Sequence, residues 1–481
     1  MAIRFLYYAI ILWLGAYGLL SLIWIGLYLR HSNEHPQRAS AQMDEWPTVV
    51  VQLPVYNERH VVDRLIEAAA SLDYPRERLE VQVLDDSTDD TTRIVREQAS
   101  RFRNQGTNVQ VLHRPRREGF KAGALAYGLA RTQAEFVAIF DADFRPESGF
   151  LREVMPYFVA RPELGVVQAR WGHLNDIYSL LTRAQALLLD GQFVVEQTAR
   201  NRSGLLMCFN GSGGVWRRQA IVDGGGWQSD TMNEDMDLSY RAQVAGWQVL
   251  YLPDLEAPGE LPPQMEAYKQ QQARWACGSM QCLRKLSGLV IHSDLTLPQK
   301  IASILHMGGY LTQPLIIALL LMSLPIVCQA RPMPGILALL GLVGLGQPLL
   351  WVLAQSRLHR DWARRILYLP VLALVGVGIT ASTTRAVFQG LTQWGGTFKR
   401  TPKFKIEGRQ GHWSTSLYRL MPDRVVVAEL LLSLYAAGTC VVAWCRGNYG
   451  SLPFLLLYVL GFGSVACLGL FQGPHGKQEA A

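Results

Sequence analysis

The sequence has 481 residues, of which 49% are hydrophobic and only 18% charged, and its formal net charge is +7. A chain of this length is too long for one ordinary core, and its low charge content excludes a typical soluble single-domain protein. The basic residues cluster beside apolar runs, which indicates contact with anionic lipid and argues against nucleic-acid binding. They are Arg30, Arg38, Arg357, Arg360, Arg364, Arg365, Lys399, Arg400, Lys403 and Lys405. We therefore expect a lipid bilayer as a partner and no nucleic acid.

The N-terminal region is apolar from residue 5 to residue 29 and contains no charged side chain there. Roughly 20 apolar residues span a bilayer, so this run is long enough to cross one. It is too long for the core of a signal peptide, and no small-residue cleavage site follows it. We predict a retained transmembrane anchor over residues 1–32.

A polar region follows, in which short β-rich runs alternate with helical patterns. Its predicted elements are the strands Thr48–Leu53, Leu79–Leu84, Val109–His113 and Phe136–Phe140, with a helix over His60–Ser71. This alternation predicts a parallel sheet with helices on both faces. Ligands of such sheets bind at the carboxyl ends of the strands. We expect one α/β domain over residues 33–290.

Pairs of carboxylates end two of these strands. Asp141 and Asp143 follow one strand, and Asp85 and Asp86 close another. Either pair alone is also compatible with an ordinary solvated acidic turn. In extended chain Asp141 and Asp143 point the same way, and Mg²⁺ and Mn²⁺ prefer hard oxygen ligands. Two acidic strand ends in one alternating unit therefore predict a shared site that holds a divalent metal.

A further acidic cluster, Glu234 with Asp235 and Asp237, opens a helical pattern. Acidic residues in a first turn also stabilise a helix dipole, so the cluster alone decides nothing. A group transfer by direct displacement needs a carboxylate, distinct from the metal ligands, that accepts the proton of the acceptor hydroxyl. This cluster is the candidate source of that base.

The run QQQARW supplies Gln271, Arg274 and Trp275. A guanidinium suits phosphate oxygens, and an indole face can stack on a sugar ring. The same residues are also compatible with a core tryptophan beside a surface arginine.

The C-terminal third holds two apolar hairpins. They are Ile301–Cys328 with Pro334–Gln355, and Arg424–Trp444 with Leu452–Leu470. Between them Ile366–Ala381 is apolar but short, and a crossing there would put the basic loop 397–424 opposite the arginine-rich loop before it. Basic loops gather on one side of a membrane, so we predict an interfacial or re-entrant segment and about five crossings. The expected membrane domain is 291–472, with a tail over 473–481.

The motifs taken together resemble processive family-2 glycosyltransferases in order and spacing. They are VQLPVYNE, LEVQVLDDSTDDTT, GFKAGALAYGL, VAIFDADFRP, VVQARW, FNGSGGVWRR, NEDMDLSYRAQVAGW and QQQARWACG. The sequence looks most like the cellulose-synthase-like mannan and glucan synthases of plants and their bacterial relatives. The likeness runs from Thr48 to Leu286 and continues more weakly through the membrane part.

This resemblance implies a GT-A fold, an α/β domain with a Rossmann-like mixed sheet, fused to an α-helical transmembrane domain. It implies inverting transfer of a hexose from UDP-glucose or GDP-mannose, assisted by Mg²⁺ or Mn²⁺. In the implied donor site Tyr56, Glu58 and Asp85 hold the nucleobase, Asp86 and Asp141 belong to the same nucleotide-sugar site, Lys121 lies near the phosphates and Arg274 meets the diphosphate. Asp143, helped by Asp141, is the implied metal ligand. Asp235 is the implied general base, and Trp275, Gln271 and Glu234 are implied to bind the acceptor.

The basic loop is similar to the gating loop FxVTxK of cellulose synthases. Phe398, Thr401 and Lys403 match that pattern, whereas Arg400 and Pro402 depart from it. Asn233 stands where the motif ahead of the base usually begins with Thr. Neither departure removes a catalytic group.

Two products remain open at this point. One is a growing β-linked polysaccharide, a β-1,4-glucan or mannan, which passes through a channel of membrane helices. The alternative is a glycolipid made by a single addition to a ceramide-type or diacylglycerol-type acceptor. The loop match and the number of crossings favour the polymer. We expect a bacterial inner-membrane protein with a cytoplasmic catalytic domain.

Overall fold

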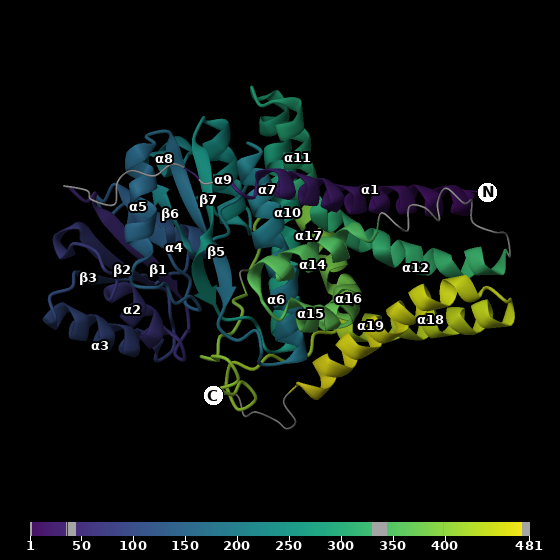
Figure 1. Ribbon diagram of the computed structural model, residues 1–481. Helices are drawn as coiled ribbons and strands as arrows, with labels where there is room; N and C mark the ends of the chain where they lie inside the picture. Colours follow the sequence, from purple (N-terminus) through teal and green to yellow (C-terminus); the bar gives the residue numbers. More distant parts are fainter. Residues whose placement is uncertain (1, 35, 37–44, 330–343, 398, 474–481) are drawn as a thin grey trace.

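The computed structural model describes residues 2–34, 36, 45–329, 344–397 and 399–473. Figure 1 shows two regions side by side: an α/β domain built around one sheet, and a set of long helices that extend away from it. Further helices, among them α6, α10, α14, α16 and α17, lie between the two regions.

One sheet forms the core of the α/β domain, and over the described residues its order is β3-β2-β1-β4-β6-β5-β7. The strands are β1 (Val49–Val55), β2 (Leu79–Asp85), β3 (Val109–His113), β4 (Phe136–Ile139), β5 (Leu164–His173), β6 (Gly214–Arg217) and β7 (Gln248–Gly259). The first four strands pair in parallel, and β5 is parallel to β7. Strand β6 runs antiparallel to both neighbours, so the sheet is mixed. The four predicted strands and their parallel pairing are confirmed.

Strand β1 shows why this sheet is buried on both faces. Val49, Val51 and Leu53 pack into one apolar cluster with α2 and α5, and Val50 packs into a second cluster on the other face. All four side chains are at most 1% exposed. A continuous β-branched run of this kind is typical of a strand covered on both sides, and each buried side chain contributes about 1.5–3 kcal/mol.

The helices of this domain pack on the sheet or continue from its edge. They are α2 (Val62–Ala70), α3 (Thr91–Asn104), α4 (Phe120–Leu129), α5 (Phe150–Ala160), α6 (Leu180–Asp190), α7 (Gln197–Arg202), α8 (Arg218–Asp223), α9 (Glu234–Val244) and α10 (Met265–His292), with a π-helix over Gly191–Glu196 and a 3₁₀ turn over Arg76–Arg78. Helix α2 buries Val62, Leu65, Ile66 and Ala69, which lie one helical turn apart. The predicted helix over His60–Ser71 is therefore confirmed.

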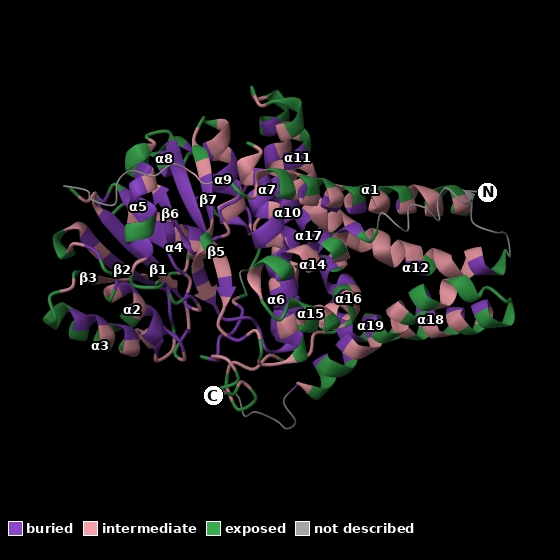
Figure 2. Ribbon diagram, viewed as in Figure 1, coloured by how far each residue is buried: buried purple, intermediate pink, exposed green. Residues whose placement is uncertain are grey.

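The remaining helices form the apolar region. They are α1 (Ala2–His31), α11 (Leu297–Met307), α12 (Thr312–Cys328), α14 (Gly346–Leu358), α15 (Trp362–Arg365), α16 (Leu369–Gly378), α17 (Thr380–Thr392), α18 (Val425–Cys445) and α19 (Leu452–Phe471), with 3₁₀ turns at Gly309–Leu311, Ile366–Tyr368 and Tyr449–Ser451. Among the described residues four helices are long and apolar enough to cross a membrane: Ile3–His31, Gly309–Cys328, Val425–Cys445 and Tyr449–Phe471. Figure 2 shows that α1, α12 and α18 consist mostly of residues of intermediate or high exposure, while the central strands are buried.

Two predicted membrane segments differ from the structure in detail. The run expected over Ile301–Cys328 is divided at Gly308, where α11 ends, and only Gly309–Cys328 is a candidate span. Of the run Pro334–Gln355, residues 334–343 lie outside the described residues. Its described part belongs to α14, which packs through Leu350 and Ala354 against Trp24 of α1.

The segment predicted to be interfacial or re-entrant forms a bent pair of helices. Trp362–Gly378 and Thr380–Thr392 meet at an angle of 46°, which fits either a broken span or a re-entrant loop. Counting the pair as one span would raise the number of candidate crossings to five.

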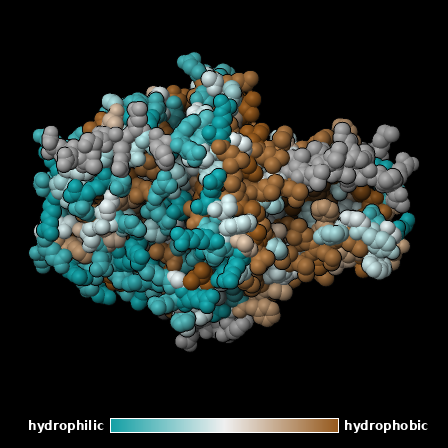
Figure 3. All heavy atoms as spheres, viewed as in Figure 1, coloured by the Kyte–Doolittle hydropathy of each residue, from teal (hydrophilic) through white to brown (hydrophobic). Residues whose placement is uncertain are grey.

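The hydropathy of the surface differs between the two regions. Figure 3 shows a hydrophilic face over the α/β domain and a broad hydrophobic face over the long helices. Large side chains such as Leu431, Leu434 and Phe454 are more than 60% exposed there. Soluble proteins rarely expose so continuous an apolar surface, so these helices are suited to a bilayer.

Buried polar contacts connect the two regions. Asp190 at the end of α6 accepts a hydrogen bond from Gln355 of α14 (2.7 Å) and contacts His173 of β5 (2.9 Å). Lys269 of α10 forms ion pairs with Glu266 (2.9 Å) and with Glu429 of α18 (2.8 Å). Because these groups are almost fully buried, each depends on its partner from the other region.

Candidate active site

An open cleft lies at the carboxyl ends of β1, β2 and β4, where Tyr56, Asp86 and Asp141 follow the strands. Helices α4, α9 and α10 and the loop after α17 complete its walls. It encloses about 1010 Å³ of space, including solvent at its mouth.

The two carboxylates of the FDADF turn are each paired with a lysine. Lys121 of α4 lies 2.5 Å from Oδ1 of Asp141, and Lys403 of the loop lies 2.7 Å from Oδ2 of Asp143. The backbone N–H of Asp141 donates to Oγ of Ser212 (3.0 Å), which fixes the turn after β4. The predicted pair therefore lies at the strand end, facing the cleft.

The residues present fit a divalent metal. Asp141 and Asp143 supply hard oxygen ligands, and the cations that now pair with them show that positive charge is favourable at both carboxylates. No cluster of three or more His, Cys, Asp or Glu that could hold a metal occurs among the described residues. A metal held by two carboxylates would complete its coordination with phosphate and water oxygens, as Mg²⁺ commonly does.

Glu234 and Asp235 open α9 and line the cleft. Burial raises the pKa of Glu234 to about 7, an effect that Lys121 opposes from 3.8 Å. Burial also raises the pKa of Asp235, and Lys121 again opposes the rise. A carboxylate with a raised pKa accepts a proton more readily than an ordinary aspartate, so Asp235 is suited to act as a base.

Gly211 explains how Asp235 and Lys121 come so close together. Its φ of +81° is a conformation that favours glycine. A Cβ at this position would lie 2.9 Å from Oδ2 of Asp235 and 3.4 Å from Nζ of Lys121. The carbonyl oxygen of Gly211 accepts a hydrogen bond from Lys121 (2.9 Å). This glycine therefore holds the lysine while leaving room beside the carboxylate.

Helix α10 brings Gln271, Arg274 and Trp275 to the cleft, as predicted from QQQARW. Trp275 is partly buried and packs on the cluster that contains Phe193 and Leu261, so its ring is fixed in place. Trp275 is therefore not only a core residue, because it also lines the cleft.

The part of the cleft next to the ends of β1 and β2 contains Tyr56, Glu58 and Asp86. Asp86 is held by a bidentate ion pair with Arg114 (2.7 and 2.5 Å). Burial raises the pKa of Glu58 to about 8, opposed by Arg400 and Lys403.

Asp85 differs from the other predicted residues, because it does not line the cleft. It is fully buried, accepts hydrogen bonds from Thr92 (2.7 Å) and the backbone N–H of Ser87 (2.9 Å), and contacts His113 (3.0 Å). Its contacts are those of a residue that fixes the turn carrying Asp86.

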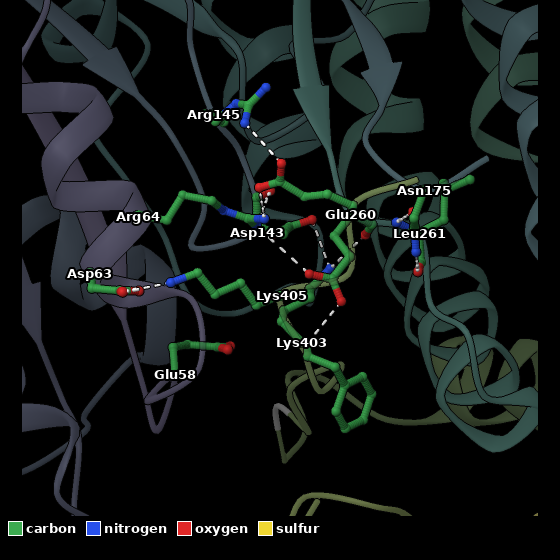
Figure 4. Close-up of polar contacts among 12 residues, drawn as sticks. Glu58, Asp63, Arg64, Asp143, Arg145, Asn175, Glu260, Leu261, Lys403 and Lys405 are labelled. Atoms are coloured by element: carbon green, nitrogen blue, oxygen red, sulfur yellow. Dashed lines mark hydrogen bonds and ion pairs between the residues drawn. The ribbon is translucent and has the colours of Figure 1, made fainter. Parts of the chain in front are cut away.

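The loop after α17 reaches across the cleft. Arg400, Thr401 and Lys403 line it, and Arg400 forms an ion pair with Glu58 (3.2 Å) and lies over the ring of Tyr418 (3.9 Å). Phe398, the first residue of the predicted gating motif, lies outside the described residues. Figure 4 shows Lys403 directed at Asp143, with Lys405 directed at Asp63.

Sequence reasoning did not assign several residues that line the cleft, namely Arg117, Trp171, Asn210, Gly211, Met232, Asn233 and Arg400. Trp171, Asn210 and Gly211 lie within the motifs VVQARW and FNGSGG, so these motifs could have identified them as site residues. Arg117, whose guanidinium lies 3.5 Å from the centre of the Tyr56 ring, carried no such signal.

Comparisons with known proteins agree with this geometry. Residues 47–278 match the profile of a family described as "Glycosyltransferase like family 2". The "Probable glucomannan 4-beta-mannosyltransferase 7" of Oryza sativa subsp. japonica is 43% identical over 261 residues, which are 53% of this chain and 45% of that protein. "Glucomannan 4-beta-mannosyltransferase 9" of Arabidopsis thaliana is 42% identical over 261 residues, covering 53% and 49%. The chain thus spans about half the length of the curated relatives that it matches.

A solved structure shares the fold. The "Mannosyltransferase PcManGT from Pyrobaculum calidifontis in complex with GDP-Man and Mn2+" superposes with a TM-score of 0.53 at 21% identity, covering 80% of this chain and 99% of that one. At this identity the similarity establishes the fold alone.

Proposed function

We propose that the chain is a membrane-embedded β-mannan synthase, because residues 47–278 match the family 2 glycosyltransferases. It transfers mannose from GDP-mannose to the end of a growing β-1,4-linked glycan, with inversion at the sugar carbon. The observation that carries the reaction type is the position of Asp235 in one cleft with Asp141, Asp143 and Lys121. The choice of mannose rests on the glucomannan 4-β-mannosyltransferases, which are 42–43% identical over the catalytic domain.

The roles of the residues follow from their positions. Tyr56, Glu58 and Asp86 form the nucleotide side of the cleft, with Asp85 supporting the turn from beneath. Arg274 and Lys121 provide positive charge toward the donor diphosphate. Asp141 and Asp143 would hold Mg²⁺ or Mn²⁺, which supplies charge neutralisation for the departing diphosphate when bound.

We assign the binding and the deprotonation of the acceptor to residues of α9 and α10. Trp275 offers an apolar face for the terminal sugar, and Gln271 and Glu234 provide polar contacts beside it. Asp235 removes the proton from the acceptor hydroxyl as that oxygen attacks the sugar carbon. Attack from the side opposite the leaving diphosphate inverts the configuration at that carbon.

The membrane arrangement is part of the proposal. Lys405 lies 2.6 Å from Asp63, and the backbone N–H of Met265 donates to Oε1 of Gln472 (2.7 Å). The loop and the end of α19 therefore contact the catalytic domain, as does α14 through His359, 3.7 Å from Asp190. These contacts support a bent pair α16–α17 that enters and leaves on the catalytic side, which we propose to be cytoplasmic. Of the five proposed crossings, four are the candidate spans of the described residues, and the fifth is the run Pro334–Gln355, of which residues 334–343 lie outside the described residues.

A direct experiment tests the product. The full chain, purified in detergent without added lipid acceptor, is incubated with labelled GDP-mannose, UDP-glucose or UDP-N-acetylglucosamine and Mn²⁺. We expect incorporation from GDP-mannose into a product of many sugars that β-mannanase digests. Asp143→Asn and excess EDTA should each abolish incorporation.

Two other outcomes would contradict parts of this proposal. Incorporation from UDP-glucose alone would replace the mannan by a glucan. An organic-extractable product with one sugar, formed only when ceramide or diacylglycerol is supplied, would establish a glycolipid enzyme and contradict the polymer proposal.

A further inference from the structure

We propose that Lys403 and a divalent cation are alternative partners of Asp143, so that the docked loop excludes free metal from the cleft. The Nζ of Lys403 lies 2.7 Å from Oδ2 of Asp143, and the two side chains are only 10% and 13% exposed. This inference rests on the proposed metal site and adds a role for the loop that the proposed function does not contain.

The position of Lys403 is fixed by its neighbours on the loop. The backbone N–H of Phe404 donates to Oε1 of Glu260 (2.8 Å), and Nζ of Lys403 lies 3.4 Å from the carbonyl oxygen of Glu260. Glu260 is buried and lies 3.7 Å from Arg64. The loop backbone is therefore anchored directly beside the ion pair, as Figure 4 shows.

Further contacts dock the residues that follow. Glu407 pairs with Arg64 (2.9 Å) and Arg145 (3.0 Å), and the backbone N–H of Gly408 donates to the carbonyl oxygen of Leu174 (2.7 Å). Lys405 pairs with Asp63 (2.6 Å). Lys405 has a φ of +59°, which is unfavourable for a residue with a Cβ and indicates that these contacts impose the loop conformation.

The two aspartates of the turn are paired with lysines from different parts of the chain. Lys121, which pairs with Asp141, belongs to α4 of the domain core and is also held by the carbonyl oxygen of Gly211. Lys403 comes from a loop more than 250 residues further along the chain, since its contact with Asp143 spans a separation of 260 residues. A movement of the loop therefore frees Asp143 but leaves Asp141 paired.

Electrostatics make the two partners exclusive. An ammonium group at 2.7 Å from a carboxylate oxygen occupies the position from which a metal would approach it. In a site shielded from water, two cations on one carboxylate repel each other strongly. A metal that arrives with a nucleoside diphosphate differs, because its phosphate oxygens offer the displaced ammonium a new partner.

The consequence is that metal enters the cleft together with the nucleotide and is weakly bound without it. The test measures binding of Mn²⁺ to the full chain by the loss of the free Mn²⁺ electron paramagnetic resonance signal, with and without GDP. Lys403→Gln removes the competing charge, and Lys403→Arg keeps it. Lys399→Gln is the matched control, because it removes an exposed lysine of the same loop that does not line the cleft.

Without GDP, we expect Lys403→Gln to bind Mn²⁺ about tenfold more tightly than the parent protein. Lys403→Arg and Lys399→Gln should bind it as weakly as the parent does. With GDP present, the difference between Lys403→Gln and the parent should shrink. Size-exclusion profiles and thermal unfolding confirm that each variant is folded.

Two results would overturn the inference, and they are distinguishable. Equal Mn²⁺ affinities of Lys403→Gln and the parent without GDP would show that Lys403 does not compete, while the proposed function would stand. If Asp143→Asn left Mn²⁺ binding in the presence of GDP unchanged, the metal assignment itself would fall, and this inference with it.

Discussion

The ammonium group of Lys121 lies 2.5 Å from Oδ1 of Asp141 and, by extending from the first turn of α4, also faces the acidic start of α9. One lysine is thereby shared between the carboxylate that would hold a metal and the carboxylates that would handle the acceptor proton. Although burial lowers the pKa of Lys121, Asp141 and Glu234 raise it above the ordinary value, so the lysine stays charged.

This sharing predicts a shift in the pH dependence of the Lys121→Gln variant. Burial raises the pKa of Asp235, and Lys121 lowers it. A general base works when deprotonated, so activity is lost as pH falls through that pKa. Without Lys121 the pKa rises further, and the loss should begin at a higher pH than in the parent. Measured kcat as a function of pH checks this. An acid limb at an unchanged pH, with Lys405→Gln as reference, would contradict it.

Asp235→Asn should lower kcat by a factor of about 10²–10⁴, because the amide keeps the shape but cannot accept a proton. GDP binding, measured by calorimetry, should remain near that of the parent, since Asp235 is assigned to the acceptor and not to the nucleotide. Asp223→Asn changes an exposed carboxylate outside the cleft and serves as the control. Near-parent turnover by Asp235→Asn would remove Asp235 from the role of base.

Trp275→Ala should shorten the polymer or abolish it while donor binding is retained. The indole is held by Phe193 and Leu261, so it offers a fixed apolar face on which the terminal sugar can rest between additions. Trp275→Phe keeps an aromatic face and should give chains of intermediate length. Gel filtration of the labelled product measures the effect. Parent-length chains from Trp275→Ala would show that the ring does not hold the acceptor.

The topology predicts protection of two positions from a membrane-impermeant thiol reagent in intact cells. Cysteines placed at Arg103 and Lys405 should both stay unlabelled, because the ion pairs of Glu407 with Arg64 and Arg145 still join the loop to the catalytic domain. The exposed native thiols Cys328, Cys445 and Cys467 must first be replaced. Labelling at Lys405 alone would mean that the α16–α17 pair crosses the membrane.

Much of the catalytic domain could be predicted because its signals are local. Valine-rich runs such as Val49–Leu53 indicate buried strands, and the carboxylates that follow two of the strands lie close together because parallel strands end at one edge of the sheet. The resemblance to family 2 glycosyltransferases is confirmed for residues 47–278. The GT-A-like mixed sheet is likewise confirmed, with β6 as its antiparallel member.

Contacts between distant segments could not be predicted in the same way. Nothing near Glu260 in the sequence indicates that its carboxylate accepts the N–H of Phe404, because that contact depends on where a loop 144 residues away docks. The break at Gly308 was missed for a related reason. Hydropathy alone does not distinguish a helix that ends and turns from one that continues into the span.

The buried polar contacts between the two regions have a practical consequence for preparing the protein. A soluble fragment that ends near residue 290 would keep Lys269 and Glu266 but lose Glu429, and it would keep Asp190 but lose Gln355. Lys269 and Asp190 would then keep only Glu266 and His173 as partners, and apolar residues that pack on α16, such as Leu181 and Met265, would become exposed to water. The catalytic domain should therefore aggregate when expressed alone, and crystallisation or cryo-microscopy should begin from the intact chain in detergent or lipid.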